Sequence, residues 1–212
     1  MIAQLIESLL ALLFPERCAG CGALGEPLCE RCRSALDIYP DHVRGIPALD
    51  AISIGYIYQR PIREAIHQLK YRRRRRVAQP LGQLLAELAR PHAPDIDAVM
   101  PVPMHASRLA ERGFNQAELL ASAAARGAGL PCVAAGLVRT RATSQQAHLN
   151  AQQRQANMRG VFAWQAAAPP PARILLVDDV LTTGATMSAC AIALREAGSR
   201  EVYGLALARS IR

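Results

Sequence analysis

The sequence predicts an α/β fold, built as a doubly wound parallel sheet, with a small N-terminal zinc-binding module. From about residue 51 onward, strand-like segments alternate with helical segments, which is typical of a parallel sheet with helices on both faces. Residues 174–177 are continuously apolar, as expected for a strand buried on both faces. Two Cys-x-x-Cys pairs precede the alternating region, and such pairs can hold a metal ion.

Size and composition fit this architecture. The 212 residues, 51% of them apolar and 4% aromatic, suffice for one sizeable core and a small appended module, and they do not indicate disorder. We place the module at residues 1–48 and the main domain at residues 49–212. A formal charge of +8 and a pI near 9.7 favour polyanionic partners, either a pyrophosphate-bearing metabolite or a nucleic acid, without choosing between them.

Residues 1–14 carry apolar side chains at helical spacing, which predicts an amphipathic helix packed on the body of the protein. The segment is too short to span a bilayer, and it lacks a basic leader and a small-residue cleavage site. A membrane-surface anchor is the alternative, although the polar face lacks the basic residues that such anchors use. We therefore expect a cytoplasmic protein without a membrane span.

The elements follow in order after a connector at residues 37–50, which contains prolines and a glycine. Periodicity predicts strands at 51–58, 98–102, 133–138 and 174–177 and helices at 61–70, 78–90, 107–126 and 187–197. Residues 166–171 end in three prolines and predict a stiff linker. Cys132 and Cys190 have apolar neighbours, and we expect both to be buried structural residues.

Residues 173–187 are the most informative stretch. Asp178 and Asp179 follow the apolar run, at the carboxyl end of the strand, where open α/β sheets bind ligands. Hydroxyl and backbone donors come next, just before a helix whose N-terminus attracts an anion; they belong to Thr182, Thr183, Gly184 and Thr186. This is chemistry for holding a phosphorylated sugar, and an ordinary strand-to-helix turn with helix caps is the alternative.

The four N-terminal cysteines are Cys18, Cys21, Cys29 and Cys32, with seven residues between the pairs. Each pair can present two thiolates to one tetrahedral Zn²⁺ at about 2.3 Å. Two disulfides are the competing interpretation. Because the chain shows no export signal, we expect a reducing compartment and one structural zinc per chain.

A second motif covers residues 101–118, at the end of a predicted strand. Arg108 and Arg112 stand at i and i+4, so both guanidinium groups could face one anion. A polar stretch at residues 139–149, which precedes Arg154 and Asn157, has the character of a loop that could fold over a ligand.

Residues 173–187 resemble the phosphoribosyl pyrophosphate (PRPP) signature of type I phosphoribosyltransferases, an apolar run followed by an acidic pair and a Thr-Thr-Gly-x-Thr loop. The resemblance implies that Asp178 and Asp179 accept hydrogen bonds from the ribose 2- and 3-hydroxyls, and that Mg²⁺ accompanies PRPP. It also implies that the 5-phosphate is wrapped by Leu181, Thr182, Thr183, Gly184, Ala185 and Thr186.

Nearly the whole chain resembles the ComF family of cytoplasmic proteins tied to DNA uptake during natural transformation. The shared features are the four-cysteine module, the Leu-Lys-Tyr stretch at 69–71, the motif at 101–118, the polar loop and the PRPP signature. The resemblance implies that PRPP is a ligand, and that single-stranded DNA and a DNA-uptake helicase or another competence protein are partners. It also implies that Arg108, Arg112 and Lys70 approach the pyrophosphate.

No acceptor site is recognisable, so the sequence leaves open whether the protein is an enzyme. A metabolic phosphoribosyltransferase acting on a small amine or nucleobase is the alternative function, and a sensor that binds PRPP without turnover is a third.

One departure from the family pattern is the arginine run, where a glycine is expected soon after Lys70. The run could grip the phosphates of single-stranded DNA, with Tyr71 stacking on a base, or it could be a solvated helix end. It consists of Arg72, Arg73, Arg74, Arg75 and Arg76.

Overall fold

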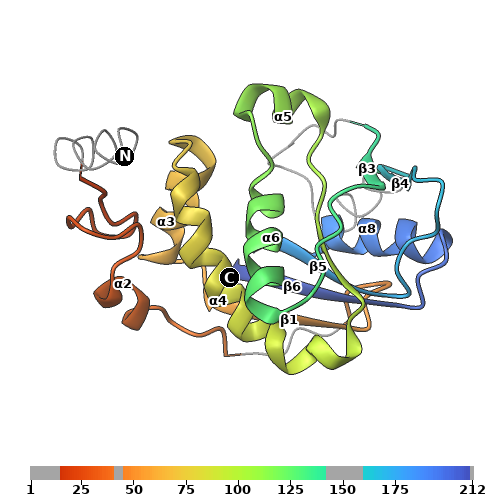
Figure 1. Ribbon diagram of the computed structural model, residues 1–212, viewed down its shortest axis with the longest axis horizontal. Helices are drawn as coiled ribbons and strands as arrows, with labels where there is room; N and C mark the ends of the chain where they lie inside the picture. The colour runs from red at the N-terminus through yellow and green to blue at the C-terminus, as the bar shows by residue number, and fades with distance from the viewer. Residues whose placement is uncertain (1–14, 41–44, 142–159, 211–212) are drawn as a thin grey trace, which may run out of the picture.

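The computed structural model describes residues 15–40, 45–141 and 160–210. A four-stranded sheet forms its centre, in the order β1-β6-β5-β2 (Figure 1). All neighbouring strands of this sheet are parallel, which confirms the predicted sheet type. The strands are β1 (Ala51–Ile57), β2 (Ala98–Pro101), β5 (Arg173–Leu181) and β6 (Glu201–Arg209).

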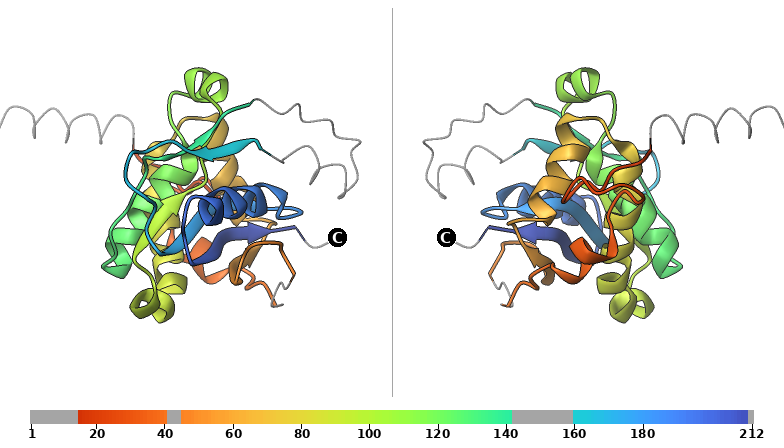
Figure 2. Two further views of the ribbon diagram at one scale, coloured as in Figure 1. Left: turned by 90° about the vertical axis from the view of Figure 1, so that its right-hand side faces the viewer. Right: turned by 90° about the vertical axis from the view of Figure 1, so that its left-hand side faces the viewer.

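The helices of the described residues are α2 (Glu30–Ser34), α3 (Ile62–Tyr71), α4 (Ala78–Ala89), α5 (Ala106–Arg112), α6 (Gln116–Ala128) and α8 (Ala185–Glu196). Two short 3₁₀ helices span Arg75–Val77 and Arg90–Asp95. A separate antiparallel pair consists of β3 (Leu137–Arg139) and β4 (Phe162–Trp164). Helix α5 stands above the other helices in every view (Figures 1 and 2).

Strand β5 shows why helices cover both faces of the sheet. Successive side chains of a strand point to opposite faces. Leu175 and Val177 join the core with α3, α4 and α6, whereas Ile174 and Leu176 join the core with α8. All four side chains are buried. The doubly wound arrangement predicted from the unbroken apolar run is therefore confirmed.

The predicted helix at 107–126 is wrong as a single element, because the chain breaks into α5 and α6. Gly113 ends α5 in the left-handed region, at φ +80°, with its N–H donating to the carbonyl of Leu109. Asn115 then caps α6, since its Oδ1 accepts from the N–H of Ala117 at 3.1 Å. Its Nδ2 donates to the carbonyl of Val102 at 3.0 Å, which ties α6 to the end of β2.

Two other predicted bounds also differ. The predicted strand at 133–138 begins only at Leu137 and continues to Arg139, and this strand, β3, lies outside the main sheet. Strand β5 extends past the acidic pair, because its pairing with β6 continues to Leu181, whereas β2 ends opposite Val177.

Cys190 is buried as expected, but the expectation for Cys132 was wrong, since its side chain is exposed.

The predicted N-terminal helix at 1–14, most of the predicted polar loop at 139–149, and Arg154 and Asn157 after it lie outside the described residues. Within the described ranges, no helix is both long enough and apolar enough to cross a membrane.

Candidate functional site

A polar cleft of about 660 Å³ lies where the parallel strands end. The segments that follow β1, β2 and β5 contribute to its walls, as does the C-terminal end of α3. Ligands of open α/β sheets bind at this edge, and the volume is within the usual range for small-molecule sites. Five cationic side chains face three acidic ones in its lining, which favours an anionic ligand.

The acidic pair of β5 lines this cleft, but the two carboxylates differ in environment. Asp179 is 3% exposed and forms an ion pair with Lys70 of α3. Asp178 is half-buried and accepts a hydrogen bond from the N–H of Asp179 at 2.8 Å. Burial, followed by the neighbouring charge of Asp179, raises the pKa of Asp178 well above its ordinary value. Asp178 is thus the more accessible of the two.

Lys70 is held inside the cleft rather than extended into solvent. Burial alone would lower the pKa of Lys70, but the adjacent charge of Asp179 outweighs it and raises that pKa. The side chains are 19% and 4% exposed for Lys70 and Asp179, respectively. Removing either partner would leave a charge with little compensation.

The hydroxyl-rich loop turns directly from β5 into α8. Gly184 caps α8 at φ +80°, and an added Cβ would lie 2.7 Å from the side chain of Ile46. Both the conformation and the space therefore require glycine. Thr182 and Thr186 line the cleft, and the Oγ of Thr183 accepts from the N–H of Ala185 at 3.4 Å.

The remaining loop residues of the predicted set do not line the cleft. Leu181 is buried in the core that contains α8. Leu181, Thr183, Gly184 and Ala185 are absent from the cleft lining. Since the first turn of α8 contains no acidic side chain, its free N–H groups and dipole favour an anion beside this loop.

Arg108 and Arg112 lie one turn apart on α5, and both line the cleft. The structure therefore brings them to the same space as Asp178. The guanidinium of Arg112 lies over the ring of Tyr71, 5.5 Å from its centroid, and donates to the Oε1 of Gln116. Helix α5 has no buried residue, so it forms a wall of the cleft with little packing of its own.

Sequence reasoning named Arg139 only as the first residue of the loop that could fold over a ligand, and it did not name Tyr58, yet both line the cleft. Arg139 ends β3, and its guanidinium lies over the ring of Phe162 at 5.6 Å from the centroid. Burial, followed by repulsion from Arg108, lowers the pKa of Arg139. Its place at the start of the predicted polar loop was a usable signal, whereas nothing in the sequence singled out Tyr58.

The arginine run is neither a plain helix end nor a uniformly exposed cationic surface. Arg73 donates to the carbonyl of Glu111 at 2.7 Å and Arg75 to the carbonyl of Gly113 at 2.9 Å. These contacts hold the end of α5 against the loop after α3. Arg73 adopts φ +53°, the left-handed conformation that glycine tolerates best. This is the segment where the family pattern predicts a glycine.

The other members of the run face the cysteine module or solvent. Arg74 donates to the carboxylate of Glu16 and to the carbonyl of Arg17. Arg76 lies 3.7 Å from the same carboxylate, with its side chain 81% exposed. Arg72 caps the end of α3 and is exposed. Only Arg73 of the run lines the cleft.

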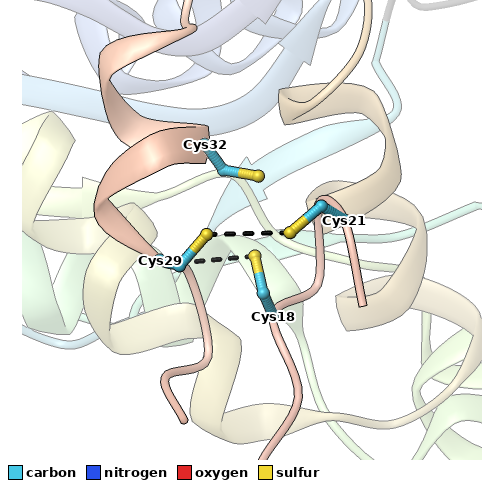
Figure 3. Close-up of side chains that lie close together, drawn as sticks. All are labelled: Cys18, Cys21, Cys29 and Cys32. Carbon is cyan, nitrogen blue, oxygen red and sulfur yellow. Dashed lines mark hydrogen bonds between the residues drawn. The ribbon is translucent and has the colours of Figure 1, made fainter. Parts of the chain in front are cut away.

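The four cysteines converge as predicted. Their sulfur atoms all lie within 4.8 Å of one another, and Figure 3 shows them facing a common centre. The Sγ atoms of Cys21 and Cys29 are 3.7 Å apart, far beyond the roughly 2.05 Å of a disulfide. A tetrahedral metal with about 2.3 Å bonds to sulfur requires sulfur atoms about 3.8 Å apart. The cluster therefore fits a metal ion such as zinc.

The local surroundings shift the pKa values of these thiols in different directions. The N–H of Ala23, followed by the guanidinium of Arg31, lowers the pKa of the Cys21 thiol to about 6. Burial raises the pKa of Cys32. A metal requires every ligand thiol to lose its proton. The module packs on α3, because Cys18, Leu28 and Cys32 share a core cluster with that helix. The predicted boundary between residues 1–48 and 49–212 stays a prediction.

Comparison with known proteins gives relatives over most of the chain. Competence protein F of Haemophilus influenzae is 30% identical over 206 residues, covering 91% of this chain and 90% of that protein. DNA utilization protein YhgH of Escherichia coli K12 is 34% identical over 161 residues, which cover 73% of this chain and 70% of that protein. Competence protein ComFC of Streptococcus pneumoniae is 33% identical over 108 residues, which cover 51% of this chain and 46% of that protein. No family model matches the chain.

Among solved structures, the allosteric regulatory enzyme of purine biosynthesis is similar with a TM-score of 0.42 and 23% identity. The match covers 62% of this chain and 26% of that enzyme. A similarity of this size carries no argument about function, and the fold assignment rests on the strand order and helix packing described above.

Proposed function

Because the chain belongs to the ComF/YhgH family, we propose that it binds PRPP with Mg²⁺ in the polar cleft and handles single-stranded DNA in the cytoplasm during natural transformation. One observation carries the PRPP part. The cleft collects, at one sheet edge, the acidic pair, the hydroxyls before α8 and the arginines of α5.

Each part of PRPP has a chemical counterpart in this lining. The 5-phosphate would bind beside Thr182 and Thr186, where the start of α8 favours an anion. The ribose hydroxyls would donate to Asp178, the more accessible carboxylate. The pyrophosphate would face Arg108 and Arg112, since arginine matches the geometry of phosphate oxygens.

Lys70 and Asp179 would then act together. Their ion pair neutralises Asp179 before a ligand arrives, so we assign Asp179 a positioning role instead of a direct bond to ribose. Mg²⁺ binds through one or two carboxylates together with substrate phosphates, and Asp178 is the carboxylate that suits it. The metal would compensate charge on the pyrophosphate.

We assign zinc as the metal of the four-cysteine cluster. The donor set is four thiolates, which zinc accepts readily in structural sites. With four protein ligands, such a site is closed and has a structural role, so we place no chemistry there.

The DNA part rests on the names of the relatives, competence protein F and DNA utilization protein YhgH, together with the formal charge of +8. The exposed arginines Arg72 and Arg76 suit phosphates, and Tyr71, which is 64% exposed, suits an unpaired base.

Calorimetry tests the PRPP part directly. PRPP with Mg²⁺, ribose 5-phosphate and pyrophosphate are titrated into the wild type, Asp178→Asn and an Arg108→Gln/Arg112→Gln variant, with Arg126→Gln as a control on the exposed face of α6. Loss of a charged hydrogen bond costs about 1.5 kcal/mol or more, so Asp178→Asn should weaken PRPP at least about tenfold. The α5 variant should lose affinity for PRPP and pyrophosphate but keep it for ribose 5-phosphate. No heat with PRPP in the wild type would refute this part.

A further inference from the structure

A second hollow, separate from the polar cleft, lies between the cysteine module and α3. Its volume is about 600 Å³. Residues 17–22 form one wall, and Arg60, Glu64, Gln68 and Arg72 form the other. We refer to these residues, together with Arg74, as the arginine hollow.

The second wall lies along α3 and at its two ends. Glu64 and Gln68 form a polar stripe one turn apart on the helix, Arg60 lies in the turn before the helix, and Arg72 is its C-cap. The neighbouring stripe, which includes Ile66 and Leu69, is buried in the core. The polar stripe instead faces the cysteine turn, and in Figure 1 the red segment lies beside α3.

The exposed arginines of the arginine hollow favour an anion. Four arginines and one glutamate contribute to its lining. Glu16 pairs with Arg74, and a zinc-bound cluster of four thiolates would add two negative charges, so these charges balance overall. The anion preference therefore rests on the solvent-exposed guanidinium groups of Arg17, Arg60 and Arg72, because the pair between Arg60 and Glu64, at 3.4 Å, is exposed at Arg60 and such pairs are worth little.

The arginine hollow adjoins the polar cleft through the arginine run. Arg72 and Arg74 line the hollow, whereas Arg73 between them lines the cleft. Tyr71, which is 64% exposed, lines the cleft beside Arg72. An extended anionic chain could therefore contact both spaces by crossing a single loop.

We propose that the arginine hollow binds the phosphate backbone of single-stranded nucleic acid and leads the strand past Tyr71 toward the polar cleft. This inference rests on the proposed DNA function and adds its binding site. A single strand is the occupant that fits, because its phosphates can meet the arginines while an unpaired base packs on the part of Tyr71 that Arg112 and His67 leave exposed.

The test measures anisotropy of a labelled oligo-dT strand at two salt concentrations. Arg60→Gln/Arg72→Gln should bind at least about fivefold more weakly, and its salt slope should fall by about 1.4, since each phosphate contact on single strands contributes about 0.7. Arg126→Gln/Arg200→Gln removes the same charge from exposed arginines outside the hollow and should stay within twofold of the wild type. PRPP affinity should not change in either variant.

Gln68→Glu is a second variant that adds one negative charge to the same wall and should weaken oligo-dT binding while the helix stays intact. Unchanged affinity and slope in the Arg60/Arg72 variant would overturn the inference. Loss of bound zinc in that variant, without any loss of affinity for oligo-dT, would also overturn it, because the two arginines would then serve to balance the charge of the thiolates. A poly-glutamate peptide competing as well as oligo-dT would also overturn it.

Failure of the wild type to bind oligo-dT would refute the DNA part of the proposed function itself. Wild-type binding with an unaffected Arg60/Arg72 variant would refute only the arginine hollow.

Discussion

Replacing Lys70 with Met should destabilise the protein strongly at neutral pH and much less in mild acid. The change removes the partner of Asp179, whose side chain is 4% exposed. The orphaned carboxylate must then take up a proton to avoid a buried charge. An unfolded Asp carboxyl has a reference pKa of about 3.9, and keeping it protonated costs about 1.36 kcal/mol for each pH unit above that value. The free energy of unfolding should therefore fall by up to about 4 kcal/mol at about pH 7 and by about 1.5 kcal/mol at about pH 5.

Urea unfolding at both pH values measures this difference. Lys70→Met/Asp179→Asn is the matched variant, because it removes both charges. It should be less destabilised than Lys70→Met, with a coupling of at least about 2 kcal/mol. A loss below about 1 kcal/mol at neutral pH, or equal losses at both pH values, would refute the buried pair. In the wild type the raised pKa of Lys70 contributes stability at neutral pH that is lost only as the pH rises through that pKa.

Three further predictions concern other parts of the molecule. In metal analysis, Cys21→Ser should contain less than half an equivalent of zinc per chain. The control Cys132→Ser changes an exposed cysteine outside the cluster and should keep a full equivalent. Equal zinc contents in the two variants would exclude the cluster as the zinc site. In urea unfolding, Arg73→Gly should be more stable than Arg73→Ala by about 1 kcal/mol. Both variants lose the hydrogen bond to the Glu111 carbonyl, but only glycine adopts the positive φ of this position without strain. An Arg73→Ala variant at least as stable as Arg73→Gly would contradict this. Because the pKa of Asp178 is raised, its carboxyl keeps a proton at pH values where an ordinary Asp has lost it. PRPP affinity should therefore rise with pH above the ordinary Asp range more steeply in the wild type than in Asp178→Asn, and parallel pH profiles would contradict that role.

Patterns within a single segment predicted much of the fold. The unbroken apolar run at 174–177 identified a strand buried on both faces, and Asp178 lies at the ligand-binding edge as expected. The cysteine spacing predicted a cluster that the structure brings together. The break between α5 and α6 was missed, although Gly113 and Asn115 are typical of a helix end and a helix start.

Contacts between distant segments were not predictable in the same way. The pairing of Lys70 with Asp179 depends on how α3 packs against β5. Arg73 and Arg75 donate to backbone carbonyls at the end of α5. The sequence of five consecutive arginines does not indicate that individual members of the run bind different partners. Arg139 lines the cleft from β3, which belongs to a separate two-stranded sheet.

A crystal structure of the protein soaked with PRPP and Mg²⁺ tests the central claim most directly. We predict density for the 5-phosphate beside Thr182 and Thr186, for the pyrophosphate near Arg108 and Arg112, and an intact contact between Lys70 and Asp179. An empty cleft at a saturating concentration, or PRPP bound elsewhere on the molecule, would contradict the account.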